Sequence, residues 1–106
     1  MKTKLIAIGL ASAMACGNAL AVIVMGAVPC GVWVKDRTEK GWNETADRSW
    51  LTGFLSGLAI ESEKDVLRTV NAESIYLWMD NYCRANPLKQ LATGGQVLFE
   101  ELSKGK

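Results

Sequence analysis

The chain has 106 residues, and its 12 basic and 11 acidic side chains give a formal net charge of +1. A chain of this length forms one domain, and its near-neutral charge excludes the basic stripe with which nucleic-acid-binding proteins contact phosphates. The sequence contains no histidine, so the commonest general base and the commonest metal ligand are both missing. We therefore expect a non-enzymatic domain with no cofactor, no metal and no nucleic-acid partner.

Residues 1–21 have the layout of a secretory signal peptide. Lys2 and Lys4 form a positive start, residues 5–15 are apolar, and Ala19 and Ala21 place small side chains at the −3 and −1 positions of a cleavage site. We expect cleavage after Ala21 and export to the periplasm. Without the two leader lysines, the remaining chain has ten basic and eleven acidic side chains and stays near neutral.

Two other fates of this N-terminus remain open. The apolar sequence continues to Val28, which is long enough for a retained membrane anchor. Alternatively, Cys16 follows small residues and would be the lipidated residue of a lipoprotein, although the preceding Ala13-Met14-Ala15 lacks the usual leucine. A membrane association is expected only if the leader is retained.

The number of cysteines agrees with cleavage. Cys16 lies inside the leader, so its removal leaves the even pair Cys30 and Cys83, and exported proteins reach a compartment in which disulfides persist. A bridge across 53 positions would stabilise the fold by about 4 kcal/mol, because it restricts the unfolded chain. We therefore predict a Cys30–Cys83 disulfide; two free buried thiols would instead require a reducing compartment.

The segment 22–42 is predicted to be apolar and irregular. Gly26, Pro29 and Gly31 interrupt any long helix in it. A short helix over residues 30–38 is an alternative, because apolar and polar side chains there fall at helical spacing.

A helical domain is predicted over residues 43–106, tied to the N-terminal segment through Cys30. Asn43 is the expected N-cap of its first helix, which runs to about Ile60 with an apolar face. Small residues four positions apart on this helix predict close helix packing. The core-packing residues predicted here and in the next helix are Trp50, Gly53, Phe54, Gly57 and Trp78.

A polar break follows the first helix, and residues 66–70 after it are predicted to form a single helical turn at most. Two further helices come next. Asn71 is the expected N-cap of one helix, and Asn86-Pro87 ends it, because a residue before proline is driven out of the α region. The last helix is predicted to start at Pro87 and to run to about Leu102, with Gly94 and Gly95 indicating close packing or a kink. The fold class is thus all-α, a small bundle of three to four short helices with one disulfide after a signal peptide.

Catalytic and metal motifs are missing. The run Gly53-Phe54-Leu55-Ser56-Gly57 has its serine one place too late for a nucleophile elbow, and no Cys-x-x-Cys pair or calcium-binding loop is present. Four tryptophans are many for so short a chain. Trp33 and Trp42 flank a charged stretch, so we predict that these two rings form a protein-interaction surface.

Three segments carry a resemblance to known proteins: residues 50–57 (WLTGFLSG), 75–83 (IYLWMDNYC) and 86–88 (NPL). In these, the chain resembles small exported bacterial proteins of the HdeA-like and Tai-type immunity groups, over roughly Cys30 to Leu102. The resemblance implies a compact, helical, disulfide-bonded periplasmic protein. Members of the first group look like chaperones that shield clients under acid stress, and members of the second bind and neutralise secreted cell-wall hydrolases.

The expected function is therefore that of a periplasmic module that binds or neutralises a protein partner in the bacterial cell envelope. Two alternatives are an acid-stress holdase and an accessory protein of a conjugation or secretion apparatus. The chain lacks the lysine-rich termini of the acid chaperones, and the pattern transfers no functional residue to it.

Overall fold

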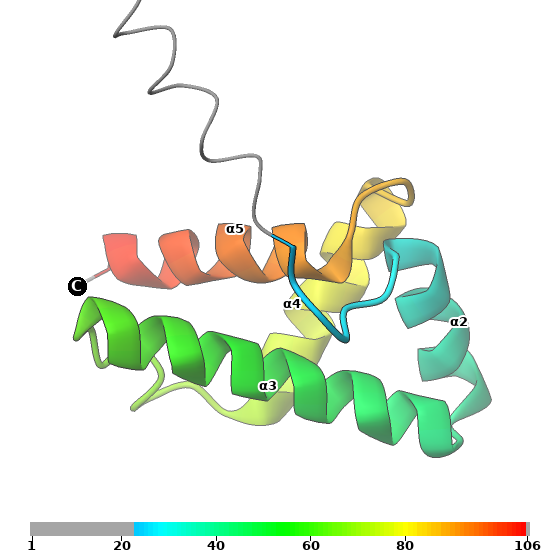
Figure 1. Ribbon diagram of the computed structural model, residues 1–106, viewed down its shortest axis with the longest axis horizontal. Coiled ribbons are helices and arrows are strands. Elements are labelled where there is room, and N and C mark those ends of the chain that lie inside the picture. The colour runs from blue at the N-terminus through cyan, green and yellow to red at the C-terminus, as the bar shows by residue number, and fades with distance from the viewer. Residues whose placement is uncertain (1–22, 106) are drawn as a thin grey trace, which may run out of the picture.

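The structure, a computed structural model, describes residues 23–105 of the chain. This part contains four α-helices joined by short loops (Figure 1). They are α2 (Cys30–Glu39), α3 (Trp42–Ser62), α4 (Ala72–Ala85) and α5 (Leu91–Lys104). The prediction of a small all-α bundle is confirmed. The predicted signal peptide, its cleavage site and Cys16 lie outside the described residues.

The helices form a bundle in which α2 and α5 each contact both α3 and α4. In Figure 1, α3 and α5 lie side by side, α4 crosses behind them, and α2 closes one end. A short link, residues 40–41, joins α2 to α3, so the two helices meet at a corner. Within residues 23–105, no helix combines the length and the apolar character needed to cross a membrane.

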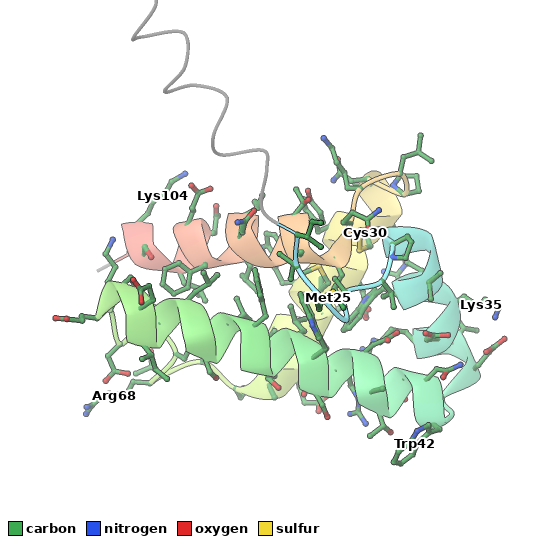
Figure 2. The ribbon with its side chains drawn as sticks, in the orientation of Figure 1. Met25, Cys30, Lys35, Trp42, Arg68 and Lys104 are labelled. Atoms are coloured by element: carbon green, nitrogen blue, oxygen red, sulfur yellow. A yellow bond between two sulfur atoms is a disulfide. The ribbon has the colours of Figure 1, made fainter. Side chains whose placement is uncertain are left out.

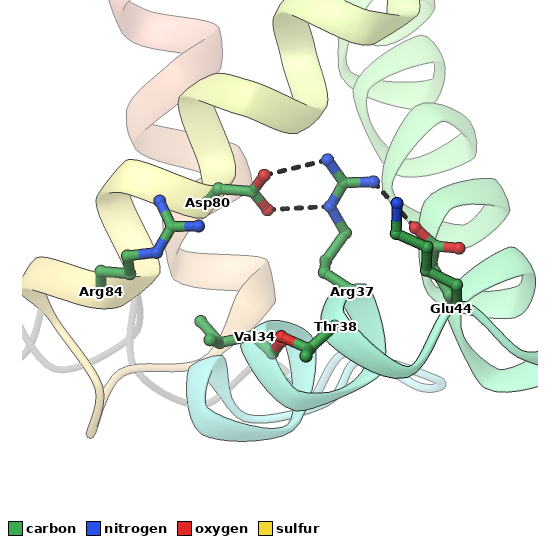
Figure 3. Close-up of a pocket in the computed structure, with 7 residues that line it drawn as sticks. Val34, Arg37, Thr38, Glu44, Asp80 and Arg84 are labelled. Atoms are coloured by element: carbon green, nitrogen blue, oxygen red, sulfur yellow. Dashed lines mark hydrogen bonds and ion pairs between the residues drawn. The ribbon is translucent and has the colours of Figure 1, made fainter.

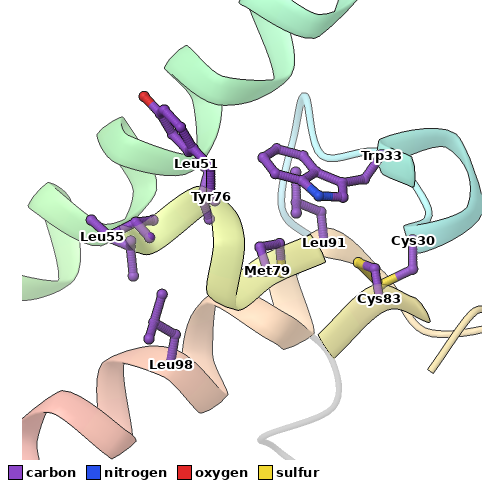
Figure 4. Close-up of a cluster of buried hydrophobic side chains, with 10 residues drawn as sticks. Cys30, Trp33, Leu51, Leu55, Tyr76, Met79, Cys83, Leu91 and Leu98 are labelled. Atoms are coloured by element: carbon purple, nitrogen blue, oxygen red, sulfur yellow. A yellow bond between two sulfur atoms is a disulfide. The ribbon is translucent and has the colours of Figure 1, made fainter. Parts of the chain in front are cut away.

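The disulfide between Cys30 and Cys83 is present, as the cysteine count predicts. It joins the first residue of α2 to the C-terminal part of α4, and both side chains are fully buried (Figure 4). The two Cα atoms lie 4.8 Å apart. The bridge therefore fixes the N-terminal segment onto the helical core.

The segment 22–42 is not irregular throughout. Residues 30–39 form α2, which begins after Pro29, whose backbone is extended with φ −65°. Pro29 is the N-cap residue of α2, and the φ near −65° that its ring imposes is compatible with this extended backbone. The alternative of a short helix was correct, and the irregular interpretation was wrong for residues 30–39, whereas residues 23–29 belong to no helix.

Two predicted helix starts differ from the structure. α3 begins at Trp42 with Gly41 as its N-cap, so Asn43 lies inside the first turn and is not the cap. α5 begins at Leu91 and not at Pro87. The later start of α5 has a physical reason, because the residues before it pair in antiparallel fashion with the segment before α2. The Cys30 amide donates to the Lys89 carbonyl at 2.9 Å, and the Leu91 amide donates to the Val28 carbonyl at 2.8 Å.

The limits of α4 agree with the local signals. The amide of Ser74 donates to the Asn71 side chain at 2.8 Å, as an N-cap requires, and the helix ends at Ala85, before Asn86-Pro87. Residues 66–69 form a turn between α3 and α4, and no helix.

The core lies where the four helices meet (Figure 4). Gly94 and Gly95 of α5 allow close packing, since a Cβ atom at Gly94 would lie 2.7 Å from the Met79 sulfur and one at Gly95 would lie 2.8 Å from the Phe54 ring. The close-packing interpretation of this pair is confirmed. The buried apolar residues are Cys30, Trp33, Leu51, Leu55, Val66, Ile75, Tyr76, Met79, Cys83, Leu91 and Leu98.

Gly53 and Gly57 do not pack closely against any helix. Both are exposed, and a Cβ atom added to either would have no neighbour within 4 Å. The prediction of a close helix approach at this pair was wrong. The side of α3 that faces the core contains Leu51 and Leu55. Gly53 and Gly57 lie on the solvent side of the same helix.

Candidate functional site

Arg37 is the centre of a partly buried network of charged groups (Figure 3). Its Nε and Nη2 atoms each donate a 2.9 Å hydrogen bond to one of the two oxygens of Asp80, and its Nη1 atom donates one of 2.9 Å to Glu44. The hydrogen bonds to Asp80 are the main reason that the pKa of Arg37 is raised above its ordinary value. This two-point geometry is specific to arginine and fixes α2, α3 and α4 relative to one another.

Trp33 belongs to this network and does not lie on the surface. Its side chain is fully buried, and its Nε1 atom donates a 2.8 Å hydrogen bond to Asp80. The prediction that Trp33 forms part of an interaction surface was therefore wrong. Spacing along α2 carried the relevant signal, because Trp33 lies three positions after Cys30 and four before Arg37, on one face of the helix.

Trp42, the other predicted surface ring, is 82% exposed. It is the first residue of α3 and lies directly after the link to α2 (Figure 2). Figure 2 shows its ring pointing away from the bundle. Its role in binding stays a prediction, but the structure places a large aromatic side chain in solvent at the α2–α3 corner.

A small pocket opens beside this corner (Figure 3). Its volume is about 150 Å³. Three cations and two carboxylates line it, so the lining has an excess of one positive charge. The lining residues are Val34, Arg37, Thr38, Lys40, Glu44, Asp80 and Arg84.

Lys40 lies in the link between α2 and α3, lines the pocket, and has an unusual backbone conformation. It follows the last residue of α2 and has φ 56° and ψ 36°, in the left-handed region that favours glycine. Its amide closes the helix by donating to the Asp36 carbonyl at 3.0 Å. Lys40 and Arg84 were not among the residues that the sequence singled out, because neither belongs to a motif.

Two acidic side chains, Asp36 of α2 and Asp47 of α3, are buried and interact with each other. Burial, followed by the hydrogen bond and the negative charge of Asp36, raises the pKa of Asp47 to about 7. A protonated Asp47 therefore donates to Asp36 in mild acid. The Oδ2 atom of Asp47 is buried, and no group of the described residues donates a hydrogen bond to it.

The remaining aromatic residues pack inside the bundle or along its edge. Trp50 is half-buried, stacks on Phe54 with a centroid distance of 4.9 Å, and donates to the Met25 carbonyl at 2.8 Å. Trp78 is half-buried and stacks on Tyr82 at 5.4 Å. These rings have structural partners, which leaves Trp42 as the tryptophan of residues 23–105 that is mainly in solvent.

A second, shallower hollow of about 390 Å³ lies between α3 and α5. Apart from Glu100, its lining is uncharged: Leu58, Thr93, Gln96, Val97 and Phe99. It therefore offers fewer charged groups to a ligand than the pocket at the corner.

Within residues 23–105, no three cysteine or carboxylate side chains gather as ligands for a metal ion. Comparison of the chain with protein-family models, with curated proteins and with solved structures finds no match.

Proposed function

We propose that this chain is a non-enzymatic module of the bacterial cell envelope that binds, and in doing so neutralises or regulates, a protein partner. The observation that carries the proposal is the exposed Trp42 ring at the α2–α3 corner; the charged pocket that Lys40 and Glu44 help to line opens at the same corner. Tryptophan and arginine are the residues that most often dominate the binding energy of protein interfaces.

The free energy of this exposed ring supports the proposal. Transfer of a large aromatic side chain from water to an apolar surface gains roughly 2–3 kcal/mol, and the described part of the fold does not use this gain at Trp42. A partner that covers the ring would gain it. The charged groups that line the pocket at the same α2–α3 corner would supply orientation and specificity.

Rigidity of the corner also supports binding. The helix α2 is attached near both ends, by the disulfide at Cys30 and by the hydrogen bonds of Arg37 to Asp80. A surface held in one conformation loses little entropy on binding, so more of the contact energy appears as affinity.

The proposed location is the periplasm. The layout of residues 1–21 predicts export, and the Cys30–Cys83 disulfide is of the kind that persists outside the cytoplasm. The resemblance to the HdeA-like and Tai-type groups favours the same compartment and a binding role.

The test compares three forms of the protein as bait in a periplasmic extract of the cells that make it: wild type, Trp42→Ala and Ile60→Ala. Ile60 is a matched control, because it is 78% exposed and lies near the opposite end of α3. We expect a partner that wild type and Ile60→Ala retain and that Trp42→Ala loses. Equal recovery with all three baits would contradict a binding site at the corner.

A further inference from the structure

We propose that the pocket between α2, α3 and α4 binds the carboxylate of an aspartate or glutamate side chain on the partner protein. The partner itself rests on the function proposed above, whereas the preference of the pocket for a carboxylate rests on its own lining.

The charged groups at the base of the pocket, Arg37, Asp80 and Glu44, bind one another and together carry one negative charge. Arg37 donates to both oxygens of Asp80 and to one oxygen of Glu44, and Trp33 adds a further hydrogen bond to Asp80. These carboxylates are occupied by donors of the protein itself. Lys40 and Arg84 add two positive charges, so the lining as a whole has an excess of one positive charge, and these two side chains are the cations left to bind a ligand.

Lys40 and Arg84 have unused donors. Within residues 23–105, neither has a carboxylate at ion-pair distance. Arg84 donates one long hydrogen bond of 3.3 Å to the Asn81 side chain, and the rest of its guanidinium group is free to bind. Both side chains are exposed, so they can turn toward a ligand at the mouth of the pocket. Their chemistry selects an acceptor with negative charge.

The size of the pocket selects a single functional group. Sites for drug-sized ligands usually enclose about 300–1,000 Å³. This pocket encloses about 150 Å³, which suits a carboxylate and its adjacent methylene groups and excludes a nucleotide. Val34 supplies an apolar wall for the methylene groups. The hydroxyl of Thr38 already donates to the Val34 carbonyl at 3.1 Å and adds no free proton.

The backbone conformation of Lys40 allows a variant that loses the charge for binding without destabilising the fold. Its φ of 56° favours glycine, so Lys40→Gly removes the cation and relieves backbone strain at once. Glu63 has the same φ of 56° at the end of α3 and does not line this pocket. Glu63→Gly is therefore a matched control, with the same relief of strain and the pocket left unchanged.

The probes are the blocked amino acids N-acetyl-glutamate N-methylamide and N-acetyl-glutamine N-methylamide, added at constant ionic strength. Binding is followed by the NMR shifts of the backbone amides of Thr38, Lys40 and Arg84. We expect saturable shifts with the glutamate probe in the millimolar range and none with the glutamine probe. In the double variant Lys40→Gly/Arg84→Gln we expect an affinity at least about tenfold weaker, and in Glu63→Gly an unchanged one.

Equal shifts with both probes, no saturation with the glutamate probe, or full binding by the double variant would each overturn the proposal. Loss of binding by Lys40→Gly together with a melting temperature at or above that of wild type supports it, since misfolding is then excluded. The two proposals fail separately. A saturable titration without any Trp42-dependent partner would contradict only the proposed function, and a Trp42-dependent partner without a titration would contradict only the carboxylate site.

Discussion

Arg37 and Asp80 are joined by two hydrogen bonds of 2.9 Å, although 43 positions separate them in the sequence. This pair fastens the C-terminal half of α2 to α4, and the Cys30–Cys83 disulfide fastens its first residue to the same helix. The shortest helix of the bundle is thereby held at two points. The α2–α3 corner, which contains Lys40 and Trp42, comes immediately after this fixed helix in the chain.

Removal of the Arg37 guanidinium should destabilise the fold strongly. In Arg37→Met, the mostly buried carboxylates of Asp80 and Glu44 lose their counter-charge, and we expect a loss of about 2–3 kcal/mol in the free energy of unfolding. Urea denaturation monitored by circular dichroism measures this loss. Lys35→Met is the control, because its ion pair with Glu39 is exposed and should contribute less than about 1 kcal/mol. Equal losses in the two variants would refute a structural role of the network.

The buried pair Asp36 and Asp47 makes stability depend on pH. Because the folded protein raises the pKa of Asp47 from 3.8 to about 7, the folded state binds this proton more tightly than the unfolded state. This contribution to stability is complete below about pH 4 and is lost as the pH rises through 7. Asp47→Asn should therefore stabilise the protein by roughly 2–4 kcal/mol at pH 8 and have little effect near pH 4.

Denaturant unfolding of Asp47→Asn at pH 4, 6 and 8 measures this dependence, with Asp65→Asn as the control at an exposed carboxylate. A stabilisation by Asp47→Asn that does not change between pH 4 and 8 would contradict the buried pair. In mild acid, this pair favours the folded state, which is opposite to what an acid-opened holdase requires of it.

The two tryptophans near the α2–α3 corner should differ in their effect on stability. Trp33→Phe removes the donor to Asp80 inside the core and should cost about 1–3 kcal/mol. Trp42→Ala removes an exposed ring and should change stability by at most about 0.5 kcal/mol. Thermal melts of both variants provide the comparison. Comparable losses would show that Trp42 is packed and not free for a partner.

Glycine substitutions distinguish the two glycine pairs. Gly53→Ala should stabilise α3 by roughly 0.5–1 kcal/mol, because alanine favours a helix and the added methyl group meets nothing within 4 Å. Gly95→Ala should destabilise by about 1–2 kcal/mol, because its Cβ atom would lie 2.8 Å from the Phe54 ring. Unfolding midpoints in urea test both signs, and a stabilising Gly95→Ala would contradict the close contact of α3 with α5.

Features that depend on neighbouring residues were predictable from the sequence. The cap at Asn71 and the stop before Pro87 define α4 because both act within a few positions of the chain. The start of α5 was not predictable in the same way. It is set by the pairing of residues 28–30 with residues 89–91, and local helix signals contain no information about such a distant partner.

The candidate site was predictable only in part. An aromatic surplus pointed to Trp42, and the structure places this ring in solvent. The burial of Trp33 depends on Asp80, which lies 47 positions away, so the composition around Trp33 could not reveal it. Lys40 and Arg84 come together only through the packing of α2 on α4, and the sequence gives no spacing rule for that contact.

Site-specific photo-cross-linking in living cells tests whether Trp42 lies on a surface that binds a partner protein. A photoreactive phenylalanine analogue replaces Trp42 in one strain and Leu88 in another. Leu88 is a suitable control, because it is 95% exposed and lies in the turn between α4 and α5. We predict one dominant cross-linked protein at position 42 and none at position 88. The same products at both positions, or none at position 42, would contradict a partner-binding site at the α2–α3 corner.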